Sequence, residues 1–424
     1  MTIWEVYSDH PMSQELKAIS DRLDRHPRIL YWVQEDLLRP GTKPTGRNGL
    51  TADSIIRAAL LKQAKGFSYQ ELAFFIEDSS SIRAFTRIAG KAPGRSALQH
   101  GISKIKAETW EKINRAIVCE ASLQGIEKGR VTRTDATVME SNIHAPTDSS
   151  LLYDGVRAIT RFLGKNTTDR LFQDHTRGAK KHARHIQYMR KGRKQTASYR
   201  KLLRLARKSC KYLIQAILNE PDSAWRPRAE HLLELTSRVI DQAHRRVVKG
   251  EAVPAEEKVV SIFEHHTDII KKGGRNTQFG HKLNLTTGRT GLVIDMVVED
   301  GNPADSTTAV RMVKRQTEIY GRPPRQTCFD GCYTSKQNLL EIKGLGVKDA
   351  AFHKKRSLQV EEMVSSKSVY RKLLNFRAGV EGDISTLKRK YGWYRCTWKG
   401  LDHFKAYAWL SVLACNLVTL SRLQ

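Results

Sequence analysis

The chain is poor in acidic residues, and this shortage says most about its partner. Its 424 residues include 44 Asp and Glu against 73 Lys and Arg, which gives a formal net charge of +29 and a pI of about 10.0. A positive charge of this size implies a large anionic partner, most simply nucleic acid. A membrane surface is the weaker alternative.

Two further absences concern export and membranes. The first ten residues, MTIWEVYSDH, lack the basic start and apolar run of a signal peptide. The long apolar run at residues 406–420 is too short to span a bilayer. We therefore expect a soluble, cytoplasmic protein.

Cysteines are few and scattered without a repeated pair spacing, which excludes a disulfide framework and favours free thiols. Cys328 and Cys332 are four residues apart, but no second Cys or His pair follows at zinc-finger spacing. His265 and His266 are adjacent, so in a strand they would face opposite ways and could not easily share a metal. We expect no zinc site.

Residues 1–125 are predicted to be a helical region. Apolar residues repeat at helical spacing from Leu16, from Thr51 and from Ser68, with a Pro/Gly-rich linker at residues 39–49 and a break at residues 79–81. A basic helix follows Pro93, with Ser96 as its expected cap. This order is compatible with a DNA-binding helix-turn-helix, although a plain helical bundle would show the same periodicity.

The outward-facing side chains of that last helix are the candidates for DNA contact. They are Arg95, Gln99, His100 and Lys104.

A strand is predicted over residues 131–140, where Val and Thr are frequent and side chains alternate. Asp135 lies in its middle. Acids are depleted at such positions, so Asp135 is either on a solvent face or in a functional site. The next stretch, residues 141–155, is rich in turn formers and is predicted to be a loop.

Residues 153–260 are predicted to form a basic α-helical insertion. Lys and Arg are crowded over residues 184–211 and alternate with tyrosines. Such a helix would follow a phosphate backbone, with Arg200, Arg204 and Arg207 as contacts, and its binding would weaken steeply with salt. A solvated, exposed helix is the alternative.

Residues 126–152 and 261–424 are predicted to form an α/β domain. A hairpin over residues 278–298 precedes a helix, a strand that ends at Asp330, a second helix, and a strand over residues 348–352. This order describes a mixed sheet flanked by helices. Residues 404–420 are apolar on much of their circumference and are expected to be a core helix.

Residues 373–390, LLNFRAGVEGDISTLKRK, are predicted to be a helix with one essential acid, Glu381. Arg377 and Lys388 share its helical face, which suits a divalent cation held beside phosphate; ordinary surface charge pairs are the alternative. Asp383 points to roughly the opposite side, so we expect its substitution to have little effect.

Strand ends and helix faces converge at one edge of an α/β sheet, so Asp135, Asp330 and Glu381 can meet there. Three carboxylates around two divalent cations suit in-line phosphoryl displacement, because one ion activates the attacking oxygen and the other stabilises the leaving oxygen.

Four blocks of the sequence resemble the bacterial insertion-sequence DDE transposases, most closely the ISNCY-type group. They are RTDATVMESNIHAPTDSSLL, HTDIIKKGGRNTQFGHKLNL, CFDGCYTS and RAGVEGDISTLK. The resemblance matches Asp135, Asp330 and Glu381 to the catalytic acids. Arg377 and Lys388 match the flanking cations of an Arg-x3-Glu-x6-Lys signature. Leu374 stands where relatives often have Tyr, so a phosphate contact from that hydroxyl is in doubt.

The resemblance implies an RNase H-like catalytic core and a magnesium-dependent transposase, with Mn²⁺ as a substitute and two ions in each active site. It implies nicking at terminal inverted repeats, joining of 3′-hydroxyl ends to target DNA, and a homodimer or larger assembly at the bacterial nucleoid. A domesticated, catalytically inactive DNA-binding protein and a nuclease without strand transfer are the alternatives. Trp393 and Trp398 could stack on an unpaired base or simply pack in the core.

Overall fold

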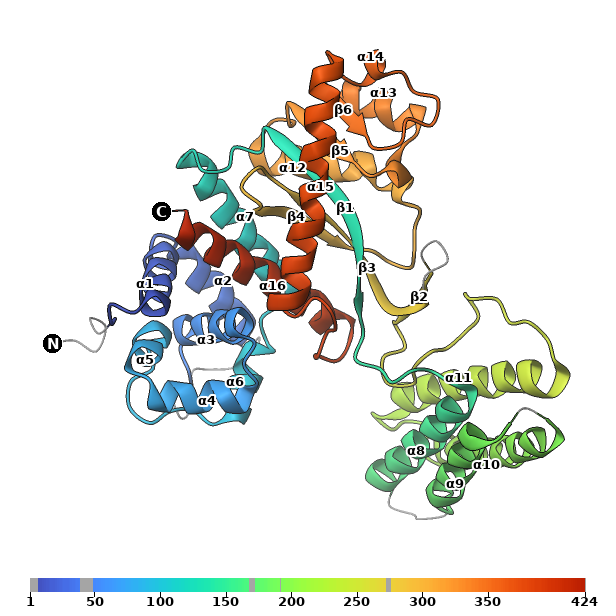
Figure 1. Ribbon diagram of the computed structural model, residues 1–424. Helices are drawn as coiled ribbons and strands as arrows, with labels where there is room; N and C mark the ends of the chain where they lie inside the picture. Colours follow the sequence, from blue (N-terminus) through green and yellow to red (C-terminus); the bar gives the residue numbers. More distant parts are fainter. Residues whose placement is uncertain (1–6, 39–48, 168–171, 191, 272–275, 424) are drawn as a thin grey trace. The chain divides into compact units, whose positions relative to one another are not determined.

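The computed structural model describes residues 7–38, 49–167, 172–190, 192–271 and 276–423 (Figure 1). The chain divides into two compact units. The first contains Met1–Ser141 and Gly280–Gln424, and the second contains Asn142–Phe279. The linker expected at residues 39–49 lies, except for its last residue, outside the described part of the chain.

The N-terminal part of the first unit is helical, as predicted. Its helices are α1 (Pro11–Asp24), α2 (Arg28–Leu37), α3 (Ala52–Lys65), α4 (Tyr69–Asp78), α5 (Ser80–Thr86), α6 (Arg95–Ile102) and α7 (Ala107–Leu123). The hydroxyls of Thr51 and Ser68 accept backbone N–H groups at the starts of α3 and α4, which fixes where these helices begin.

Two predictions in this region were wrong. The expected break at residues 79–81 is a single residue, because Ser79 caps the additional helix α5 by accepting the N–H of Ile82. Ser96 does not cap α6. The cap position is Gly94, so the helix begins at Arg95 and already contains Ser96. Serine both interrupts and starts helices, so its presence alone did not separate the two cases.

The sheet of the first unit has the mixed order that the resemblance implies. Strand β1 (Val131–Glu140) pairs antiparallel with β3 (Gln278–Thr287) and parallel with β5 (Gln326–Phe329). Strand β4 (Val293–Val298) is antiparallel to β3, and β6 (Asp349–Phe352) is parallel to β5. The six-stranded sheet has the order β2 (Asp268–Ile270), β3, β1, β5, β6, with β4 as a further partner of β3, and this mixed order confirms an RNase H-like α/β fold.

Helices flank this sheet: α12 (Ala309–Tyr320), α13 (Lys336–Gly344), α14 (Val360–Met363), α15 (Lys367–Lys390) and α16 (Leu401–Arg422), with short 3₁₀ turns at Asp305–Thr307 and Gly331–Tyr333. The expected core helix is confirmed, since α16 is buried over most of its length. Buried Asn416 ties it to β4 by accepting the N–H of Val293 at 2.8 Å, and to α7 by donating to Asn114 at 2.8 Å.

Helix α16 also corrects the argument about apolar length. The apolar run at residues 406–420 is too short to cross a membrane. The whole helix, Leu401–Arg422, is long and apolar enough to do so. However, 83% of that window is buried within the protein, which is typical of a core helix.

The second unit is a helical bundle. It contains α8 (Asp148–Asn166), α9 (Thr176–Tyr188), α10 (Arg193–Asn219), α11 (Arg226–Ala243), a π-helical turn (His244–Lys249) and the short strand β2 (Asp268–Ile270). The loop predicted over residues 141–155 was wrong beyond Thr147. This threonine caps α8 reciprocally with Ser150, so the helix begins inside the polar stretch.

Candidate active site

The first two acids lie at matching positions on neighbouring strands. Thr134 of β1 is paired with Phe329 of β5, so Asp135 and Asp330 are each one step further along two parallel strands. The carboxyl ends of parallel strands meet at one edge of a sheet, where loops and helices can reach both side chains. The sequence argument for convergence is therefore supported by the register.

Local structure holds each aspartate differently. Asp135 is in the middle of a strand rich in Val and Thr, and its Oδ1 accepts the N–H of Ala136 at 2.7 Å. Asp330 follows the last residue of β5 and precedes the 3₁₀ turn, where its carbonyl accepts the N–H of Tyr333 at 3.1 Å. Both carboxylates are therefore carried by well-fixed backbone.

Helix α15, which carries the third acid, crosses β1 (Figure 1). Arg133 of β1 fastens the two elements together. The Arg133 guanidinium donates to Asp383 at 2.7 Å and to the carbonyl of Phe376 at 2.8 Å. A Cβ on Gly379 would lie 2.0 Å from this guanidinium, so glycine is needed for the close approach. Asp383 also accepts the hydroxyl of Thr287 at 2.7 Å.

Asp383 is thus a structural anchor. The expectation that its substitution would have little effect does not fit this environment, because the change would leave the buried Arg133 without its carboxylate. Burial raises the pKa of Asp383, while Thr287 and Arg133 act in the opposite direction. Helical spacing placed Asp383 correctly away from Glu381 but did not reveal that the far side faces the sheet.

Arg377 brings the three acids together. Its Nη2 lies 3.0 Å from Oδ2 of Asp135 and 3.4 Å from Oδ1 of Asp330, and its Nη1 lies 3.4 Å from Oε1 of Glu381. Exposure rises along the series, since the three carboxylate side chains are 14%, 32% and 70% exposed. The site therefore has a buried end at β1 and an open end on α15.

The fit to a divalent cation depends on these carboxylates. No three His, Cys, Asp or Glu side chains in the described ranges are close enough together to hold a metal ion as they stand. The Arg377 guanidinium occupies the point that Asp135, Asp330 and Glu381 share. The donor set itself suits Mg²⁺, which prefers carboxylate oxygens, and three negative charges face one positive charge there.

Tyr333, three residues after Asp330, is close enough to Asp135 and Asp330 for their charges to act on its phenol. Burial raises the pKa of its phenol far above the usual range, and Asp305 and Asp135 add to the effect. The neutral hydroxyl donates to the side-chain oxygen of Asn284. Tyr333 is therefore a fixed hydrogen-bond donor and not a source of negative charge.

Two basic residues, His353 and Lys354, follow β6 at the edge of the sheet that carries the acids. Phe329 of β5 is paired with Phe352 of β6, so His353 is level with Asp330. The Lys354 side chain lies against Gly331, where a Cβ would come within 2.6 Å of its Cγ. The signal was present, because a basic run follows a predicted parallel strand at the edge that carries the acids.

A comparison with known families identifies the domain that carries two of the three acids. Residues 239–417 match the family model described as the transposase DDE domain. The chain carries a transposase DDE domain. No curated protein and no solved structure matched the chain.

The DDE domain match includes Asp330, Glu381, Arg377 and Lys388, and it implies DNA processing in transposition. Asp135 lies before the matched range, so its assignment depends on the register of β1 with β5 and on its contact with Arg377. Lys388 is partly buried, one turn beyond the anchoring Asp383.

The predicted DNA-contacting residues N-terminal to the DDE domain differ in their exposure. Arg95 and Gln99 are exposed on α6. Lys104 lies beyond the end of α6 and is only partly exposed, because its ammonium donates to the carbonyl of Leu37 at 3.2 Å. It holds α2 in place in this structure, so it is a weaker candidate than the other two.

In the second unit, the predicted basic residues Arg200, Arg204 and Arg207 form an exposed stripe on α10. The opposite side of α10 is apolar and packs in the bundle core. The sequences of α9 and α10 contain no acid, and within the described residues none of their Lys or Arg side chains has an ion-pair partner. The two helices present concentrated, uncompensated positive charge.

The pKa values of two histidines reflect the same concentration of positive charge. Burial lowers the pKa of His182 on α9, and Lys201 of α10 and Lys181 lower it further. The pKa of His175 is lowered by burial and by Lys208 of α10. Cations of both helices therefore act on His182, and a cation of α10 acts on His175.

Proposed function

We propose that this protein is an active DDE transposase of the ISNCY-type group, which cleaves DNA at transposon ends and joins the 3′-hydroxyl ends to target DNA. The observation that carries the proposal is the contact of one guanidinium, Arg377, with Asp135, Asp330 and Glu381. Acids from two neighbouring strands and a helix share one point, and two of them, Asp330 and Glu381, lie within the transposase DDE domain.

Asp135, Asp330 and Glu381 would hold two Mg²⁺ ions, or Mn²⁺ in their place. When bound, the ions would activate the attacking oxygen and neutralise the charge on the leaving oxygen. Arg377, released from the carboxylates, pairs with a phosphate next to the scissile bond, for which a guanidinium fork is suited. Lys388 is proposed to contact the flanking backbone.

DNA is bound through two other surfaces in this proposal. Arg95 and Gln99 on α6 contact the terminal inverted repeat. The exposed Lys and Arg side chains of α9 and α10 supply salt-dependent contacts to phosphates. The protein acts in the cytoplasm on nucleoid DNA, as a homodimer or larger assembly, because two transposon ends must be processed together.

The test is a nicking assay on a labelled duplex taken from the inverted repeats that flank the gene. Asp330→Asn and Glu381→Gln should lower nicking in Mg²⁺ by more than about 10²-fold, because each removes a ligand that supports transition-state charge. DNA affinity should stay within about twofold of wild type, since neither acid is proposed to hold phosphate directly.

Glu361→Gln is the matched control, because Glu361 is an exposed glutamate on α14 outside the cluster. It should nick at the wild-type rate. Full activity of Asp330→Asn or Glu381→Gln would contradict the assignment. Binding without nicking by the wild-type protein would favour a domesticated DNA-binding protein.

A further inference from the structure

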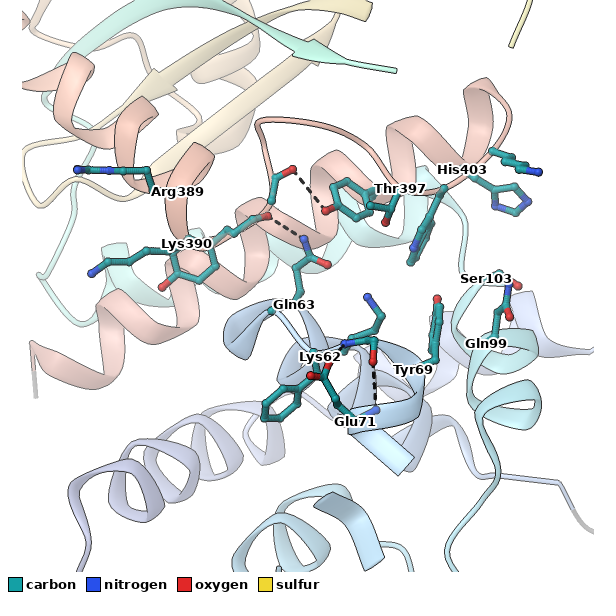
Figure 2. Close-up of a pocket in the computed structure, with 18 residues that line it drawn as sticks. Lys62, Gln63, Tyr69, Glu71, Gln99, Ser103, Arg389, Lys390, Thr397 and His403 are labelled. Carbon is teal, nitrogen blue, oxygen red and sulfur yellow. Dashed lines mark hydrogen bonds between the residues drawn. The ribbon is translucent and has the colours of Figure 1, made fainter. Parts of the chain in front are cut away.

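A pocket of about 910 Å³ lies in the first unit and is not lined by any of the three acids. Lys62, Tyr69 and Glu71 of α3 and α4 line one side, and Arg389, Lys390, Thr397 and His403 line the opposite side (Figure 2). Its volume is in the range of pockets that bind small ligands or a fragment of a larger one.

Lys62 is the unusual residue in this pocket. Its side chain is 8% exposed, and its ammonium lies 4.7 Å from the centre of the Tyr69 ring. Within the described residues the Lys62 ammonium has no hydrogen-bond acceptor and no ion-pair partner, and burial lowers the pKa of Lys62. A buried ammonium without a carboxylate is costly, so an anion that enters the pocket gains a strong contact.

The remaining charge in the pocket is also mostly positive. Arg389, Lys390 and Lys399 line it, whereas Glu71 is the one acid among its lining residues in the described chain. Glu71 is already engaged, because its carboxylate accepts the N–H of Ser68 at 2.7 Å as part of the capping box of α4. It does not neutralise Lys62.

Aromatic side chains form much of the wall. Phe67, Tyr69, Trp398 and Tyr407 line the pocket, and Trp398 packs edge-on against Tyr407. The indole Nε1 of Trp398 is buried without a hydrogen-bond partner in the described part of the chain. Aromatic faces together with cations suit a sugar and base attached to a phosphate better than a bare inorganic ion.

The position of the pocket indicates where such a phosphate comes from. Gln99 and Ser103, at the end of α6, line one side (Figure 2), and Gln99 is an exposed residue of the proposed DNA-contacting helix. Arg389 and Lys390 are the last turn of α15, which carries Glu381. Because residues of both α6 and α15 line this pocket, a DNA strand bound to α6 and extending to α15 would lie across it.

We propose that the pocket binds one backbone phosphate of the DNA, with Lys62 as its buried contact and the aromatic wall against the attached nucleoside. The proposal rests on the proposed function only in taking DNA as the substrate. It makes Lys62 a positioning residue, which acts through DNA placement and does not touch the reacting atoms.

The test measures binding of the full-length protein to a fluorescein-labelled, mixed-sequence duplex of about 30 base pairs, with salt raised from about 50 to 200 mM. Lys62→Met keeps the length of the side chain and removes the charge. Its log–log salt slope should be shallower by about 0.9, the value for one phosphate contact, with affinity lowered roughly tenfold at the lower salt. Lys62→Arg should retain the wild-type slope.

Lys17→Met is the control, because Lys17 is an exposed lysine of α1 that does not line the pocket. It should bind as wild type. The thermal unfolding temperature of Lys62→Met should not be lower than that of the wild type, because the substitution removes an unpaired buried charge. Lys62→Gln provides a second neutral variant. A wild-type slope in both neutral variants would overturn the proposal. Nicking is scored separately, so an inactive wild-type protein that shows the slope change would contradict only the proposed function.

Discussion

The α3–α5 region of the first unit and the α9–α10 region of the second unit use positive charge in opposite ways. In the first unit, buried Arg57 and half-buried Arg87 are each matched with acids. Arg57 lies 2.7 Å from Asp24 and 2.5 Å from Asp53, and Arg87 contacts the same two aspartates at 2.5 and 2.8 Å. In the second unit, α9 and α10 contain cations and no acids, and these cations lie on the surface.

The difference separates structural charge from binding charge. A buried guanidinium must have a carboxylate to offset its desolvation, so pairs in the first unit fix helices and strands. Exposed cations without acids retain their full field, which attracts a polyanion and is screened by salt. Much of the net charge of +29 is therefore available for DNA where it is not needed for folding.

The largest effect is expected on the structural side of the comparison, at Asp383. Asp383→Ala should lower the free energy of unfolding by about 3 kcal/mol, because Arg133 stays buried without its carboxylate. Urea unfolding measures the change. The double variant Arg133→Met with Asp383→Leu should lose less than the sum of the single variants, since no unpaired charge remains. Wild-type stability of Asp383→Ala would show that the ion pair does not fasten α15.

The next effect is expected on the binding side. Reversing Arg200, Arg204 and Arg207 to Glu should lower DNA affinity roughly 10²-fold at about 0.15 M salt and flatten the salt slope by about 2.7, as expected for three lost phosphate contacts. Stability should change little, because these side chains are exposed and have no ion-pair partner in the described chain. Anisotropy with a labelled duplex measures both quantities, and an unchanged slope would place the α10 stripe away from DNA.

The smallest effect concerns pH. The pKa of His182 is lowered from 6.5, so the unfolded chain binds more protons than the folded chain between the lowered value and 6.5. The stability contribution is complete above pH 6.5 and is lost as pH falls toward the lowered value. DNA phosphates offset the cations around His182, so affinity should rise by less than about threefold as pH falls through this range.

His182→Gln should remove this pH dependence of binding and leave the salt slope unchanged. Affinity measured at a series of pH values and constant ionic strength checks it. A pH dependence that persists unchanged in His182→Gln would show that other groups bind the protons.

The sequence predicted those parts of the fold and site that local patterns determine. Alternation and Val/Thr content located β1 and Asp135, and the end of a short strand located Asp330. Helical spacing placed Glu381 and Arg377 on one face, and their side chains are in contact. These features depend on residues within a few turns of each other.

Features that depend on distant partners were not predictable. Arg133 and Asp383 are 250 residues apart in the chain, so neither sequence segment shows that the other supplies its counter-charge. The contact of Arg377 with acids on two strands requires the register of β1 with β5. Residues 80–81 and 148–155 were wrongly assigned to non-helical segments, because hydroxyl residues such as Ser79 and Thr147 favour both loops and helix starts.

The central claim is that acids from two strands and one helix act as a single catalytic unit. Asp135 tests it most directly, because it lies outside the residues that match the DDE domain and is assigned from geometry. The measurement is nicking of the inverted-repeat duplex by Asp135→Asn, beside its DNA affinity. We predict nicking reduced by more than about 10²-fold with affinity within about twofold of wild type. Nicking at the wild-type rate would contradict the account.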